Sequence, residues 1–251
     1  MKTLGVDFAT EPSKTAGCVI EWADGRARVV HLEAGLDDEA IIALAAGDVS
    51  KVGIDCPFGW PVAFVDAISR HDTGGVWPGR EADGTAFRRL LSLRETDRYV
   101  RRTVGKTPLS VSANLIGATA MRLAGLLDRI AVAGEVVDRA GYGRFAEVYP
   151  SAALLRWGLP SSGYKGTSGR EQRTVIVDGL LELLPNLDLR DGDVDRCHQS
   201  DHIFDSLVAS VTARAAWLGM TNDPPEGTDL MVVAREGWIH VPLAGSTAQL
   251  F

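Results

Sequence analysis

The sequence is poor in cysteine and contains no long apolar run. Its three cysteines, Cys18, Cys56 and Cys197, are too few and too widely spaced for a disulfide framework or a Cys-x-x-Cys metal knuckle. This scarcity indicates a reducing compartment and argues against a zinc site. An apolar run of about 18 residues, which a membrane span requires, is missing, and so is the apolar core of a signal peptide. We therefore expect a cytoplasmic protein with no membrane partner.

Positive charge is also scarce and unevenly placed. The net charge is −7, from 26 lysines and arginines against 33 acids, which excludes nonspecific coating of nucleic acid. Between Arg80 and Lys106, however, eight basic residues face four acidic ones, so this segment carries +4 and the remainder −11. The distribution predicts a local, salt-sensitive phosphate contact.

The N-terminal fifth of the chain has the pattern of a small sheet. Three apolar runs are separated by short polar turns, which predicts an antiparallel meander. An acidic start followed by helically spaced apolar residues predicts a helix over 36–46, and a further apolar strand ends just before Cys56-Pro57. The expected strands cover residues 3–9, 16–22, 27–33 and 51–55.

The remaining four fifths alternate between helical and extended patterns. Glycine and proline predict a loop or mobile cover at 72–85. Apolar periodicity predicts a strand at 145–149 and a hairpin over 230–243 that turns near Glu236-Gly237. The expected helices are 61–70, 112–132, 170–184 and 200–219. We expect one domain over 1–251, with an inserted loop and helical segment at about 72–110.

Five carboxylates fall where an acid needs a special partner. Asp7 and Asp55 close apolar strands, Glu147 lies inside one, and Asp201 and Asp205 are four residues apart on one helix face. Each alone can cap a helix or pair with an arginine. Gathered in one cleft, they repel one another unless a divalent cation neutralises them, and their hard oxygen atoms suit Mg²⁺ or Mn²⁺.

A three-strand meander, a helix and a fourth strand, with acids on the first and fourth strands and on a later helix, is the layout of the RNase H-like α/β fold. In that fold, parallel strands extend the meander and helices cover both faces of the sheet. Six motifs, in order along the chain, resemble the domain of unknown function 429 family, which is described as predicted nucleases with this fold. The motifs are Gly5–Ala9, Gly53–Pro61, Arg94–Asp97, Glu147–Pro150, Tyr164–Lys165 and Asp201–Leu207. In the last of them, His202 and Ser206 depart from the residues that the family pattern leads us to expect.

The resemblance implies metal-assisted hydrolysis of nucleic acid or another phosphodiester. It makes Asp7 the bridging ligand, Asp55 the second, and Asp201 or Asp205 the third, with Glu147 as a reserve ligand or an orienting group. Two ions about 3.5–4 Å apart can activate water and stabilise the attacking and leaving oxygens.

Several basic side chains are candidates for phosphate binding. Arg94, Arg98, Arg101 and Arg102 share one face if their segment is helical, although a merely solvated helix gives the same pattern. Arg94 and Asp97 belong to a resembling motif, and Asp97 is positioned to orient Arg94.

Two further candidates lie nearer the C-terminus. Lys165 lies in a Gly/Ser-rich loop and can meet a phosphate or the solvent equally well. His202, one helical turn after His198, is a candidate proton shuttle.

Two other functions are compatible with the same order of strands, helices and acids. An ATP-binding protein of the actin or sugar-kinase type also begins its fold with an aspartate on the first strand. However, Asp7 is not followed by a Gly-rich phosphate turn, and the chain contains no Walker loop. The other alternative is a binding scaffold that has the fold without the activity.

Overall fold

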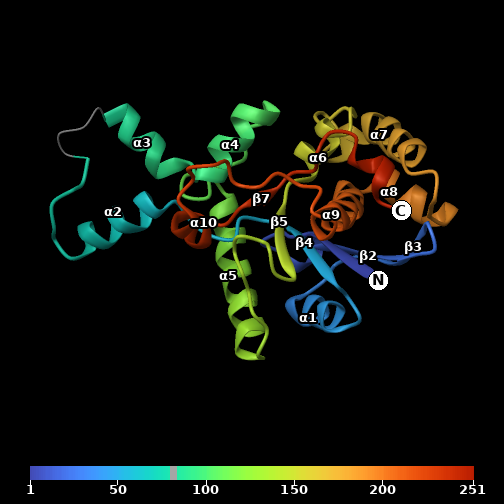
Figure 1. Ribbon diagram of the computed structural model, residues 1–251, viewed down its shortest axis with the longest axis horizontal. Helices are drawn as coiled ribbons and strands as arrows, with labels where there is room; N and C mark the ends of the chain where they lie inside the picture. Colours follow the sequence, from blue (N-terminus) through green and yellow to red (C-terminus); the bar gives the residue numbers. More distant parts are fainter. Residues whose placement is uncertain (80–83) are drawn as a thin grey trace.

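A mixed β-sheet forms the centre of the protein (Figure 1). The computed structural model describes residues 1–79 and 84–251, so Arg80, Glu81 and Asp83 of the basic segment lie outside the described residues. The sheet has seven strands in the order β6-β3-β2-β1-β4-β5-β7. Their bounds are β1 Lys2–Asp7, β2 Ala16–Ala23, β3 Arg26–Ala34, β4 Lys51–Asp55, β5 Phe145–Val148, β6 Leu187–Asp188 and β7 Ile239–His240.

The strand directions confirm the predicted fold class. β1, β2 and β3 form the antiparallel meander. β4 runs parallel to β1, and β5 and β7 extend this parallel half. β6 adds a short parallel edge beside β3. This arrangement, with helices on both faces, is the one expected of an RNase H-like α/β fold.

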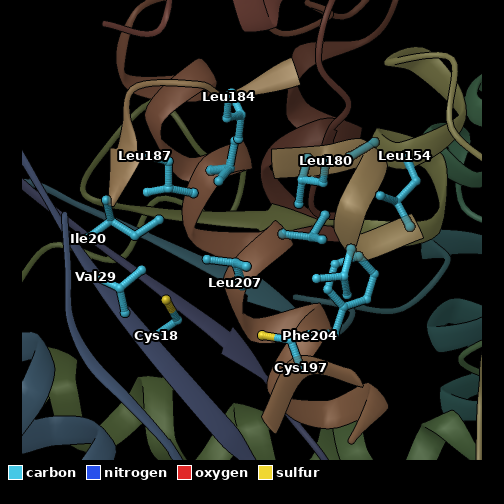
Figure 2. Packing of buried hydrophobic residues seen from close by; sticks show 14 of the residues in the cluster. Cys18, Ile20, Val29, Leu154, Leu180, Leu184, Leu187, Cys197, Phe204 and Leu207 are labelled. Atoms are coloured by element: carbon cyan, nitrogen blue, oxygen red, sulfur yellow. The ribbon is translucent and has the colours of Figure 1, made fainter. Parts of the chain in front are cut away.

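Helices pack on both faces of this sheet. One core combines Leu4, Val6 and Ile54 of the strands with the apolar sides of α1 and α5. The other core, seen in Figure 2, packs Cys18 and Ile20 against α6, α7, α8 and α9. The α-helices are α1 Asp38–Ala46, α2 Val62–Asp72, α3 Gly84–Ser92, α4 Glu95–Val104, α5 Ile116–Val132, α6 Pro150–Arg156, α7 Arg170–Leu183, α8 Asp191–Gln199, α9 Asp201–Trp217 and α10 Leu230–Glu236.

Two glycines let α9 lie directly on the backbone of the sheet. Gly5 of β1 is the register partner of Gly53 of β4, and both face α9. A Cβ on Gly5 would overlap the backbone N of Ser210 and the carbonyl of Ser206, and one on Gly53 would lie 2.8 Å from the carbonyl oxygen of Ala209. A side chain at either position therefore forces α9 away from the strands.

We expect Gly5→Ala to lower the free energy of unfolding by about 2–3 kcal/mol, because rigid backbone surrounds the added methyl group. Gly125→Ala is the matched control, since Gly125 lies inside α5 and a Cβ there meets nothing within 4 Å. The control should be neutral or stabilising by up to about 1 kcal/mol. Urea unfolding measures both, and equal stability of the two variants would contradict close packing of α9.

One expectation about secondary structure is wrong and several elements were not foreseen. Residues 230–243 do not form a hairpin: α10 occupies 230–236 and β7 then joins β5 in parallel. Asp229 caps α10 by accepting from the N–H of Met231, and Gly237, with φ of 87°, ends it. Sequence patterning also missed α6 and α8. The expected loop at 72–85 gives way from Gly84 onward to α3, which lies within the expected loop and helical segment at about 72–110.

Figure 1 shows α2 and α3 extending away from the sheet as a projecting pair. In the described part of the chain, none of the helices has both the length and the apolar character needed to cross a bilayer.

Candidate functional site

Three aspartates meet at the carboxyl ends of β1 and β4. Carboxylate oxygens of Asp7, Asp55 and Asp205 lie within 4.8 Å of one another. Asp7 and Asp55 are register partners in the parallel pair, so they leave the sheet side by side. Because side chains two residues apart share a face, these acids point to the same side as Gly5 and Gly53, which is the side covered by α9.

The third aspartate comes from α9. Asp205 lies one turn before Ala209, whose carbonyl oxygen lies above Gly53. The close contact of α9 with the two glycines thus brings a fully buried helix carboxylate down to the two strand carboxylates. The acidic cluster is a direct consequence of the glycine contact.

The environment of this cluster disfavours three negative charges. Burial, and then the charge of Asp7, hold the pKa of Asp55 well above its usual range. Burial raises the pKa of Asp205 to about 6, with Asp7 adding to the shift and Lys165 opposing it. A cation at this position would relieve the repulsion, and three carboxylates supply the hard oxygen donors that Mg²⁺ and Mn²⁺ prefer.

Proton donors surround the cluster. The Lys165 ammonium pairs with Asp205 Oδ2, and the Tyr164 hydroxyl donates to Asp205 Oδ1 at 3.0 Å. His202 Nδ1 lies 2.6 Å from Asp7 Oδ2, and this hydrogen bond raises the pKa of the imidazole. The side chains of Lys165 and His202 are 53% and 36% exposed, so both also face the solvent side of the site.

The predicted phosphate ligand Arg94 lies in the interior, 1% exposed. All five N–H groups of its guanidinium donate. Nε and Nη2 bind the Asp97 carboxylate, Nη1 and Nη2 bind the Glu147 carboxylate, and Nη1 also binds the carbonyl oxygen of Glu236, at distances between 2.6 and 3.1 Å. Asp97 therefore orients Arg94, and Arg94 joins α4 to β5 and α10.

Glu147 lines the same cavity as Asp7 and Asp55 but does not belong to the aspartate cluster. It is the register partner of Ile54, which faces α5, whereas Asp55 on the next position faces α9. Its oxygens accept from Arg94 and from the backbone N–H of Phe58 at 2.9 Å. Glu147 thus holds the segment after β4 and lies outside the aspartate cluster.

Sequence reasoning missed Glu236. This buried carboxylate accepts from the N–H of Val62 and from the N–H of Glu95, both at 2.7 Å, and so caps the first turns of α2 and α4 together. The available signal was the only acid in the largely apolar stretch 230–243.

Two other predicted site residues also lie outside the cluster. Asp201 occupies the first turn of α9, one turn before Asp205. Arg98 lies on α4, as the spacing of its arginines suggested, and its guanidinium donates to the carbonyl oxygen of Leu93 at 2.5 Å and to Glu95 Oε2 at 2.8 Å. Of the two helix acids between which the sequence did not decide, Asp205 lies in the aspartate cluster and Asp201 does not.

A cavity of about 360 Å³ opens beside the acids. Its charged and hydroxyl-bearing lining residues include Asp7, Asp55, Arg94, Glu147, Tyr164 and Lys165. Carboxyl ends of parallel strands are a common position for ligand sites in α/β proteins, and this cavity lies at those of β1 and β4.

The fold and the cleft define an α/β protein with an acidic site at the carboxyl ends of two parallel strands. The chain belongs to the family described as "Protein of unknown function (DUF429)", which matches residues 5–230. No curated protein and no solved structure matches the chain.

Proposed function

We propose that the protein is a metal-dependent phosphodiesterase of the nuclease type that uses Mg²⁺ or Mn²⁺. The observation that carries the proposal is the convergence of Asp7, Asp55 and Asp205 within 4.8 Å in a buried, charge-repelling setting. An ordinary structural role would give these acids arginine partners, as Arg94 does for Asp97 and Glu147. Asp205 and Asp7 pair instead with Lys165 and His202, which are both partly exposed, and the three carboxylates still lie within reach of one another.

Each residue then has a defined task. Asp7, Asp55 and Asp205 hold the metal, which would supply a nucleophilic water and stabilise charge on the phosphate. Lys165 can turn from Asp205 toward a phosphate oxygen, because its side chain is half exposed. His202 is held by Asp7 through Nδ1 and can give up a proton to a leaving oxygen.

We expect the purified protein to cleave DNA, RNA or a small phosphodiester in the presence of Mg²⁺ or Mn²⁺, and to be inactive in EDTA. The assay should cover single-stranded, duplex and branched nucleic acids and bis-p-nitrophenyl phosphate, with a sensitivity that detects a weak nuclease. ATP binding in the same preparations tests the kinase-type alternative. If every substrate stays intact with both metals, the protein is better described as a binding scaffold.

A further inference from the structure

The cavity beside the aspartates has a mixed lining. Asp7, Asp55 and Lys165 contribute charged groups to it, and Phe8, Leu109 and Ile116 contribute apolar surface. Leu109 is 60% exposed, which places an apolar side chain at the mouth of the cavity. A ligand that fills this space must combine a charged group with a compact apolar group.

The size of the cavity limits that apolar group. Its volume of about 360 Å³ is near the lower end of the range of about 300–1,000 Å³ for small-ligand sites. This space accommodates one base-sized group and does not accommodate a length of paired or stacked nucleic acid. A substrate would therefore present a single unstacked unit.

The rim of the cavity carries positive charge and fixed backbone. The Lys106 ammonium donates to the carbonyl oxygen of Ser161 at 2.6 Å, and the Ser151 hydroxyl donates to the same oxygen at 2.7 Å. Ser151 and Ser161 both line the cavity. Lys165, which lines the cavity and pairs with Asp205, can balance the negative charge of a phosphodiester, whereas Lys106 holds the backbone of the lining residue Ser161.

We propose that this cavity receives one unpaired base, or an apolar group of the same size, attached to the phosphodiester that the aspartates would process. The proposal rests on the proposed function for the position of the phosphate. It assigns the specificity to Leu109 and its apolar neighbours and makes the substrate either a single-strand end or a small diester. Interior positions of a duplex do not fit.

Calorimetry with adenosine 5′-monophosphate and with ribose 5-phosphate, each with and without Ca²⁺, tests the base-sized subsite without turnover. The nucleotide should bind about tenfold more tightly than the sugar phosphate, because only the nucleotide carries a base. Leu109→Ser should weaken nucleotide binding about tenfold, because it removes apolar contact area. Leu115→Ser is the matched control, since Leu115 is 95% exposed and lies outside the cavity lining. Equal binding of the two ligands, or equal effects of the two variants, would overturn the proposal.

Binding of a dinucleoside monophosphate, a linear single strand and a blunt duplex is then compared to identify which kind of molecule supplies the unpaired base. Tighter binding of the dinucleotide assigns a small diester, and tighter binding of the strand assigns a strand end. Duplex binding as tight as that of the single strand contradicts the proposal. A separate Mn²⁺ titration without nucleotide tests the proposed function alone. If Mn²⁺ does not bind, the proposed function is contradicted but a measured preference for the base still stands. If Mn²⁺ binds and the base gives no preference, only the proposal of a base-sized subsite is contradicted.

Discussion

Asp7→Asn is expected to weaken Mn²⁺ binding by more than about 100-fold and to abolish phosphodiester cleavage. Loss of a group that merely orients a ligand costs about 10–100-fold in metal affinity, so loss of a ligand at the centre of the cluster should cost more. The asparagine still reaches His202 and carries no charge, so repulsion with Asp55 falls and the chain should remain folded. Calorimetric Mn²⁺ titration and thermal unfolding measure the two effects.

Asp201→Asn is the matched control for this experiment. Asp201 begins the same helix as Asp205 but lies outside the aspartate cluster, so the variant should bind Mn²⁺ within twofold of the unmodified protein. Unchanged Mn²⁺ affinity in Asp7→Asn would remove the ligand assignment. A loss of affinity in both variants would point to a general electrostatic effect of the acidic surface.

Arg94→Met is expected to lower the free energy of unfolding by about 3–5 kcal/mol. Removing one partner of a buried ion pair leaves an uncompensated buried charge, and here two carboxylates, Asp97 and Glu147, lose the same partner. Burial already raises the pKa of Glu147, and Arg94 opposes that shift, so the variant should also take up a proton at this carboxyl on folding near neutral pH. Denaturant unfolding at several pH values measures both effects.

Arg98→Met provides the comparison on the same helix. The side chains of Arg98 and its partner Glu95 are 30% and 32% exposed, so the loss of Arg98 should cost less than about 1 kcal/mol. If the two variants unfold at the same denaturant concentration, the buried ion pairs of Arg94 stabilise the fold no more than the partly exposed pair of Arg98, and the prediction is wrong. Partial recovery in Arg94→Met combined with Asp97→Asn and Glu147→Gln would confirm that the unpaired charges cause the loss.

The sequence predicted the parts of the site that depend on local pattern. Asp7 and Asp55 stood out because each ends an apolar strand, and the expected fold places the first and fourth strands in one sheet. Choosing Asp205 over Asp201 required the position of α9 along its axis, because the two acids share one helix face and differ by one turn. That position is fixed by the contact of α9 with Gly5 and Gly53, which no local sequence pattern shows.

Long-range pairing explains the other differences. Glu147 lies in a strand as predicted, yet its register with Ile54 turns it to the opposite face from Asp55. Arg94 was a phosphate candidate because it shares a helical spacing with other arginines and belongs to a family-like motif, but Asp97 and Glu147 bind it inside the protein. The hairpin expected over 230–243 failed because Gly237 ends a helix there and does not turn a strand.

The contact between α9 and the two strand glycines divides the site into a rigid end and an adaptable end. The separation of the aspartates is set by backbone touching backbone, which is among the least compressible contacts in a protein. The cavity mouth is formed by side chains such as Leu109 that can be exchanged without disturbing this contact. Members of one family can therefore diverge in what they accept while keeping the same spacing between their acids.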